Sequence, residues 1–100
     1  MTARKPPNLC KKMQDLRVEI DAIDADLIDL LVERSRYIDR AIVIKEAEGL
    51  PARITDRVEE VVNNVATRAR AQGLDPVLVE TIWRGLIEWS IDREEERLGA

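Results

Sequence analysis

The feature that most constrains the fold is one uninterrupted segment, residues 12–48, which contains neither proline nor glycine. Its apolar residues recur at the three- and four-residue spacing of one helix face, which predicts a single long helix. They are Met13, Leu16, Ile20, Ile23, Leu27, Leu30, Leu31, Ile38 and Ala41. Gly49 and Pro51 would end this helix. At 1.5 Å per residue it would be roughly 55 Å long, which exceeds the diameter of a compact domain of this size.

Two shorter helices are expected downstream of this segment. The first would run from Thr55, a candidate N-cap, to about Gln72, and Gly73 would end it. The second would begin at Asp75–Pro76, because an aspartate N-cap followed by a proline at the first helical position is a strong helix start. It would fray by Gly99. Each is about half as long as the first predicted helix.

Residues 1–11 differ from the rest of the chain, since they contain Pro6, Pro7 and several basic side chains. We expect them to form an extended basic arm, because the residue before a proline favours extended backbone. Residues 12–100 are predicted to form a single helical domain. With 45% apolar and 36% charged residues, the chain has the balance of a soluble helical protein rather than a disordered one.

The long helix also predicts the assembly. Neither of the shorter helices could cover the whole apolar stripe, whereas a second copy of the chain could, so we expect an interleaved homodimer. A helix that merely bridges through solvent would be polar on all sides, and this one is not. The predicted fold class is therefore all-α, with three helices per chain in an intertwined homodimer.

Charge and residue usage exclude several classes of function. A net charge of −4 argues against nucleic-acid binding, since affinity for phosphates comes from excess lysine and arginine. The chain has no histidine and one cysteine, Cys10, so we expect no metal site, internal disulfide or catalytic thiol. It has no apolar run of membrane-spanning length and no hydrophobic signal segment, so we expect a cytoplasmic protein with no membrane partner.

Two basic residues lie within the apolar stripe of the long helix. On a wheel at 100° per residue, Arg34 is at the centre of the stripe and Lys45 falls within about 20° of it. Cations on an apolar face are costly unless an anion or a carboxylate meets them. For either residue alone, an internal ion pair or a snorkelling side chain would suffice. Two cations on one face favour a ligand pocket, with carboxylate partners as the alternative.

Arg17 lies elsewhere on the same helix, about 100° from Arg34 on the wheel. It cannot easily serve the same pocket from the same chain. In an antiparallel dimer, however, Arg17 could enter the pocket of the partner.

The shorter helices add three polar candidates. Arg57 lies in the first turn of the second predicted helix, and Ser90 and Glu94 share the apolar face of the third. Because the set lacks histidine, histidine-type acid–base catalysis and a nucleophilic triad are excluded. A cation-rich pocket would bind a small dianion and could catalyse a pericyclic rearrangement. Such a reaction needs a constrained conformer and stabilised charge, but no cofactor and no proton transfer.

The chain resembles the all-helical, AroQ-type chorismate mutases over nearly its whole length. The likeness is carried by Leu16–Asp24, Leu30–Arg34, Ile44–Lys45, Asp56–Arg57 and Gly73–Asp75, together with Ser90 and Glu94. The resemblance implies an intertwined dimer with two identical pockets for a chorismate-class dicarboxylate.

The resemblance also implies a role for each candidate. Arg34 and Arg57, with Arg17 from the partner chain, would hold the substrate carboxylates. Lys45 would stabilise the ether oxygen of the breaking bond from one side, and Glu94 would approach it from the other. Ser90 would contribute to substrate binding.

Three departures from the family pattern concern the substrate. Many members have glutamine at the position of Glu94, and a glutamate must be protonated to donate, so activity should rise at low pH. Ile54 and Val58 replace the polar residues that commonly bind the substrate's ring hydroxyl from the second helix. These apolar positions resemble the isochorismate pyruvate lyase branch. That branch also shares the N-terminal pattern of Pro7, Cys10, Asp15, Leu16 and Arg17, and Trp89.

The resemblance favours chorismate mutase, which converts chorismate to prephenate by a Claisen rearrangement without cofactor or metal. Isochorismate pyruvate lyase, which releases salicylate and pyruvate, is the first alternative, and aminodeoxychorismate mutase is the second. The non-enzymatic alternative is a helical dimerisation module whose cations are paired internally.

Overall fold

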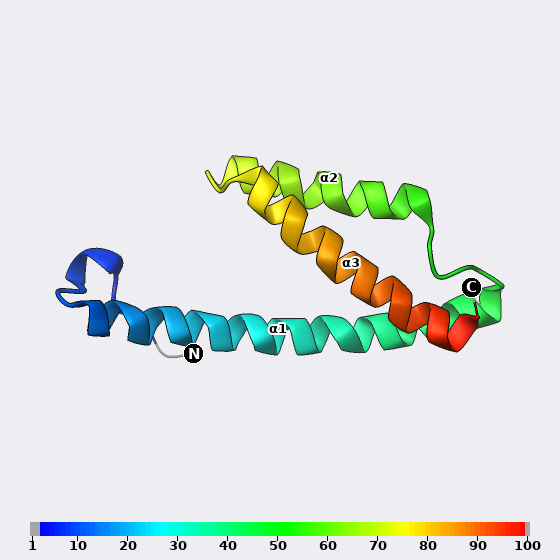
Figure 1. Ribbon diagram of the computed structural model, residues 1–100, viewed down its shortest axis with the longest axis horizontal. Coiled ribbons are helices and arrows are strands. Elements are labelled where there is room, and N and C mark those ends of the chain that lie inside the picture. The colour runs from blue at the N-terminus through cyan, green and yellow to red at the C-terminus, as the bar shows by residue number, and fades with distance from the viewer. Residues whose placement is uncertain (1–2, 100) are drawn as a thin grey trace. The chain divides into compact units, whose positions relative to one another are not determined.

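The computed structural model describes residues 3–99, which form helices and connecting segments without a strand (Figure 1). A short 3-10 helix, η1 (Pro7–Leu9), precedes α1 (Met13–Glu48), α2 (Thr55–Ala71) and α3 (Pro76–Leu98). The all-α prediction with three α-helices and a long first helix is confirmed. None of the helices described is both long and apolar enough to cross a membrane. The cytoplasmic location stays a prediction.

The chain divides into two compact units, Met1–Arg36 and Tyr37–Ala100, and the boundary falls within α1. Each unit is described by itself. The single helical domain predicted for residues 12–100 therefore stays a prediction.

The first unit carries an uncovered apolar helix face. Between Met13 and Val32, the large apolar side chains of α1 are 39% to 60% exposed, although Leu16 is half-buried. On the predicted stripe the exposed ones are Met13, Ile20, Ile23, Leu27, Leu30 and Leu31, whereas Val18, Ile28 and Val32 are exposed on other sides of the helix. Burying one such side chain stabilises a protein by about 1.5–3 kcal/mol, so burial of this face against another surface would be strongly favourable.

The N-terminal arm folds back within the first unit. Leu9 N–H donates to the Pro6 carbonyl at 2.9 Å, which closes the 3-10 turn of η1. Arg4 forms an ion pair with Asp26 of α1. The extended conformation predicted for residues 1–11 is therefore wrong at Pro7–Leu9, because the fixed φ of proline also suits the first position of a helical turn.

In the second unit, α1 ends in a turn that follows Lys45 closely. Gly49 has a φ of +70°, which favours glycine. Leu50 N–H donates to the Lys45 carbonyl at 2.8 Å, and Gly49 N–H lies 3.4 Å from the Glu46 carbonyl. These are the two bonds of a Schellman motif. The turn satisfies the carbonyl of Lys45 and leads the chain into the linker before α2.

The starts of α2 and α3 differ from each other. Ile54, not Thr55, is the N-cap of α2, and its side chain makes no capping hydrogen bond. The prediction of Thr55 as the N-cap is therefore wrong by one position. The prediction for α3 is confirmed, since Asp75 is the N-cap, its carboxylate accepts from Val77 N–H at 2.9 Å, and proline follows.

Helices α2 and α3 leave the Gly73 turn side by side and pack against each other (Figure 1). Their contact contains the core cluster of the second unit, Ala52, Val62, Ile87 and Ile91, with Val58, Val61 and Leu98 packed against it. Ala52 is the linker's contribution to this core. The linker between α1 and α2 is thus anchored to the helix pair.

Candidate active site

A buried ion pair joins α1 to α3 in the second unit. The Lys45 ammonium lies 2.8 Å from Glu94 Oε1, and the side chains are only 18% and 5% exposed. Glu94 lies on the buried face of α3 together with Val79, Ile87, Ser90 and Ile91. The helical spacing predicted that Glu94 shares this apolar face, and that prediction is confirmed.

The groups around the pair leave hydrogen-bonding capacity on both Lys45 and Glu94. The Lys45 ammonium donates a hydrogen bond of 2.7 Å to the Ala52 carbonyl. Its approach to Glu94 Oε1 is an ion pair without the angles of a hydrogen bond, and no other group in residues 3–99 donates to that buried oxygen. An ammonium has three N–H donors, so Lys45 keeps hydrogen-bonding capacity beyond Ala52. The buried carboxylate can accept a further donor as well.

The pair answers one question raised by the sequence. An internal carboxylate was the alternative to a ligand for Lys45, and Glu94 is that carboxylate. Internal pairing is what the non-enzymatic alternative expects of the cations, and a ligand role for Lys45 stays a prediction.

Two fork-shaped ion pairs flank the buried one. Arg93, next to Glu94, donates to both carboxylate oxygens of Asp39 on α1, at 2.6 and 3.1 Å. Arg53, next to Ala52, does the same to Glu88 on α3, at 2.9 and 2.7 Å. Bidentate arginine–carboxylate pairs fix geometry as well as charge. Arg93 and Arg53, the neighbours of the two Lys45 partners Glu94 and Ala52, are thereby fixed in place.

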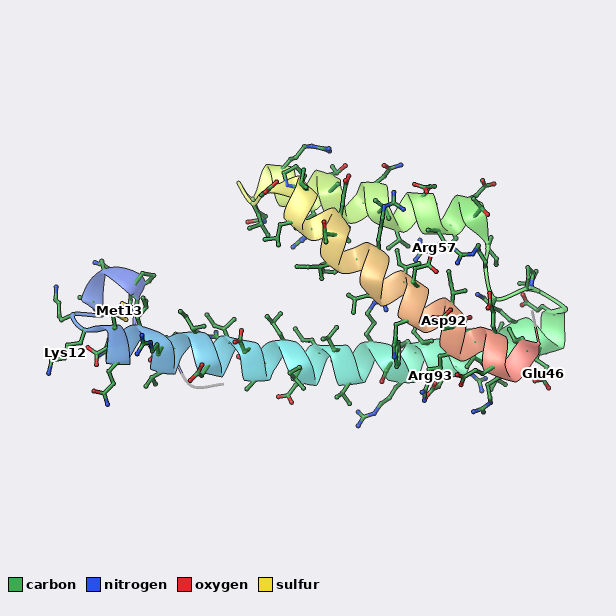
Figure 2. All side chains as sticks on the ribbon, in the orientation of Figure 1. Lys12, Met13, Glu46, Arg57, Asp92 and Arg93 are labelled. Carbon is green, nitrogen blue, oxygen red and sulfur yellow. The ribbon has the colours of Figure 1, made fainter. Side chains whose placement is uncertain are left out.

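Each of the two arginine–carboxylate pairs lowers the pKa of its carboxyl group. The hydrogen bond from Arg93 lowers the pKa of Asp39, and the hydrogen bond from Arg53 lowers the pKa of Glu88. Arg93 also lies 5.4 Å above the ring of Trp89 on its own helix, a cation–π distance. Figure 2 labels Arg93 where the last part of α3 crosses the end of α1.

An open depression lies beside Lys45. It has a volume of about 480 Å³ and is lined by Lys45, Glu46, Gly49, Leu50, Pro51, Arg97 and Leu98. Arg97 brings a second cation to this depression. In residues 3–99 no three histidine, cysteine or acidic side chains are grouped so as to hold a metal ion.

The other predicted site residues of this unit have more ordinary surroundings. Arg57 is exposed and forms an ion pair with Glu60 one turn along α2 (Figure 2). No hydrogen bond or ion pair found among residues 3–99 joins Arg57 to the Lys45–Glu94 pair. Ser90 is buried and donates to the Leu86 carbonyl at 2.8 Å.

Ile54 and Val58 are both half-buried near the start of α2. Ile54 is the N-cap residue, and Val58 packs against the core cluster. The structure thus gives Val58 a packing role. Substrate contact by either residue stays a prediction.

Arg17 and Arg34 belong to the first unit, both on α1. Arg17 is exposed, whereas Arg34 is half-buried. Their convergence with Lys45 and Arg57 stays a prediction.

Sequence reasoning missed the groups that hold the pair in place. The Ala52 carbonyl had no signal, since every residue has such a group. Arg53 and Glu88 are 35 positions apart, and Asp39 and Arg93 are 54 apart. Their sequence spacing follows no local helical rule, so only the packing of the helices reveals them.

Comparison with known proteins identifies the family. The family described as chorismate mutase type II matches residues 16–95. This range is most of the chain and contains all eight predicted site residues. The chain belongs to this family, and the resemblance inferred from the sequence is confirmed. Family membership and the names of relatives support an enzyme.

Individual relatives differ in how much of their length is matched. Isochorismate pyruvate lyase of Pseudomonas aeruginosa is 34% identical over 88 residues, which is 87% of this chain and 85% of that protein. The T-protein of Enterobacter agglomerans is 29% identical over 82% of this chain, and that of Haemophilus influenzae is 27% identical over 84%. The chain spans only 22% of the length of either T-protein.

The energetics of the pair can be tested by comparing a single variant with a double variant. Lys45→Met leaves a buried carboxylate without its counter-ion, so we expect it to lower the free energy of unfolding by about 3–5 kcal/mol. Lys45→Met/Glu94→Leu removes both charges and should be clearly more stable than Lys45→Met alone. Urea unfolding at a fixed protein concentration would measure both.

Arg84→Met is the matched control, since Arg84 forms an ion pair with Glu59 at 3.4 Å on the surface. It should cost no more than about 1 kcal/mol. A double variant as unstable as Lys45→Met would contradict the assignment of a costly buried charge.

Proposed function

We propose that this chain is a chorismate mutase, which converts chorismate to prephenate without a cofactor. The observation that carries the proposal is the buried Lys45 ammonium, held beside Glu94 and the Ala52 carbonyl with donor capacity left over. The match to the chorismate mutase type II family supports the substrate class.

The proposed reaction is a Claisen rearrangement, in which an ether C–O bond breaks while a C–C bond forms within one molecule. Negative charge develops on the ether oxygen as its bond stretches. A Lys45 N–H aimed at that oxygen would stabilise the transition state more than the ground state, which is the condition for catalysis. No proton has to be transferred and no atoms are gained or lost.

The arginines would hold the substrate in its reactive conformer. Arg34 and Arg57, with Arg17 from a second copy, would bind the two carboxylates of the substrate. Guanidinium groups suit this task because their planar forks match carboxylates. Arg57 would have to exchange Glu60 for a substrate carboxylate, which is a small change for an exposed pair.

The second copy is part of this proposal. The exposed apolar face of α1 between Met13 and Val32 is suited to burial in an intertwined homodimer. Arg17 is exposed on the same segment. Burial of this segment against a second chain would carry Arg17 into the partner's pocket.

Isochorismate pyruvate lyase activity is the second candidate. It is favoured by the 34% identity to the Pseudomonas aeruginosa lyase over most of both chains. The apolar Ile54 and Val58 also suit a pocket that does not hydrogen-bond the ring substituent. In that reaction the ether C–O bond breaks while a ring hydrogen passes to the methylene carbon of the side chain, so the side chain leaves as pyruvate and the ring becomes salicylate. Lys45 would face the same ether oxygen.

Incubation of the purified protein with chorismate and, separately, with isochorismate tests both candidates. Prephenate from chorismate would support the proposal, and fluorescent salicylate from isochorismate would support the second candidate. A protein that turns over neither of these substrates nor aminodeoxychorismate would favour the non-enzymatic dimerisation module.

Loss of the Lys45 ammonium should abolish most of the rate. Removal of one preorganised donor typically costs 10²–10³ in kcat, so we expect Lys45→Ala to lose about that much. Arg84→Ala, which removes a cation from the outer face of α3, should keep the activity of the unmodified chain. Near-full turnover by a folded Lys45→Ala variant, checked by circular dichroism, would contradict the role.

Glu94→Gln tests whether a donor at position 94 helps the reaction. A carboxylate can only accept hydrogen bonds, whereas the amide of glutamine can donate to the ether oxygen. We therefore expect Glu94→Gln to keep at least the kcat of the unmodified protein. A folded Glu94→Gln variant whose kcat falls as far as that of Lys45→Ala would contradict this expectation.

A further inference from the structure

The linker before α2 supplies a hydrogen-bond acceptor to Lys45 that is not among the predicted site residues. The acceptor for Lys45 is the carbonyl of Ala52, seven residues further along the chain. Ala52 is 2% exposed and belongs to the core cluster with Val62, Ile87 and Ile91. The methyl group thus fixes one side of the peptide that carries this carbonyl.

The other side of the same peptide is Arg53. Its guanidinium holds both oxygens of Glu88, at 2.9 and 2.7 Å. The direction of a carbonyl depends on the dihedral angles on both sides of its peptide. Ala52 restrains the preceding side through packing, and Arg53 restrains the following side through its fork.

Helix α3 therefore acts on Lys45 by two routes. Glu94 contacts the ammonium directly, and Glu88 acts through Arg53 on the carbonyl that accepts from it. Glu88 and Glu94 both belong to α3, so this one helix fixes both constraints on Lys45 relative to each other. One N–H of the ammonium is directed by the Ala52 carbonyl and its charge is held beside Glu94, so the range of directions open to its other two N–H groups is narrowed.

We propose that Arg53 and Glu88 are positioning residues for Lys45, which help to aim one of its remaining N–H groups at the reacting oxygen by fixing the Ala52 carbonyl. The proposal rests on the role of Lys45 in the proposed function. It adds the reason why a flexible lysine side chain can serve as a preorganised donor.

Stability and positioning can be separated for this pair. Arg53 and Glu88 have side chains that are 45% and 53% exposed, and exposed ion pairs contribute little to folding. A misplaced catalytic group, by contrast, is costly, since a shift of about 1 Å can reduce a rate 10²-fold. A positioning pair should therefore affect kcat far more than the stability of the fold.

The test compares two ion pairs of the same kind. Arg53→Ala should lower kcat on the order of tenfold, with KM changed less than about twofold. Arg84→Ala breaks the exposed pair with Glu59, which has no link to Lys45, and should leave kcat unchanged. Arg53→Glu/Glu88→Arg, which reverses the pair, should restore most of the loss. A kcat within about twofold of the unmodified chain for Arg53→Ala would overturn the proposal.

A second readout does not depend on turnover. The hydrogen-bonded ammonium of Lys45 should give a slowly exchanging ¹H–¹⁵N signal, assigned by its absence in Lys45→Met. We expect this signal to broaden or vanish in Arg53→Ala and to persist in Arg84→Ala. If the protein turned over neither substrate but the signal still depended on Arg53, the proposed function would fail and the coupling would stand. An ammonium signal unchanged by Arg53→Ala would overturn the coupling itself.

Discussion

The ion pair between Lys45 and Glu94 determines how the second unit is built. Two charges that leave water lose several kcal/mol of hydration each, and their attraction repays this only when the geometry is close and other polar groups help. Here the end of α1, the linker and α3 all contribute, through Lys45, Ala52 and Glu94. An apolar pair of similar volume would stabilise such a core as well or better. A charged pair at this position therefore suits the proposed chemistry better than it serves stability.

The pair also sets the electrostatics of the proposed pocket. Because Lys45 and Glu94 neutralise each other, attraction of a dianionic substrate falls to the arginines. A group that only accepts hydrogen bonds at position 94 would face a developing negative charge, whereas a donor there would stabilise it.

The sequence predicted those features that depend on local rules. Gly49, Gly73 and Asp75–Pro76 act on their own neighbours, so the bounds of the helices could be placed to within a residue or two. The 3.6-residue period likewise put Glu94 on the buried face of α3. The N-cap of α2 was misplaced because Thr55 is a good capping residue in general, yet the helix begins at it.

What the sequence could not predict depends on tertiary arrangement. The partner of Arg53 is a glutamate on another helix, and the acceptor for Lys45 is a backbone carbonyl. Neither carries a composition or spacing signal. Exposure shows the same limit, since the spacing of the apolar residues places them on one stripe of α1 but does not show that most of those between Met13 and Val32 are exposed in the single chain.

The exposed stripe connects assembly to chemistry. If a second copy covers the segment that contains Arg17, the guanidinium moves from water towards a region of low dielectric constant. A cation in that position needs an anionic partner, because an uncompensated buried charge is costly. In the proposed dimer the substrate carboxylate is that partner. The same cost that disfavours an empty pocket would then contribute to the selection of a dicarboxylate, so the interface would take part in specificity as well as in folding.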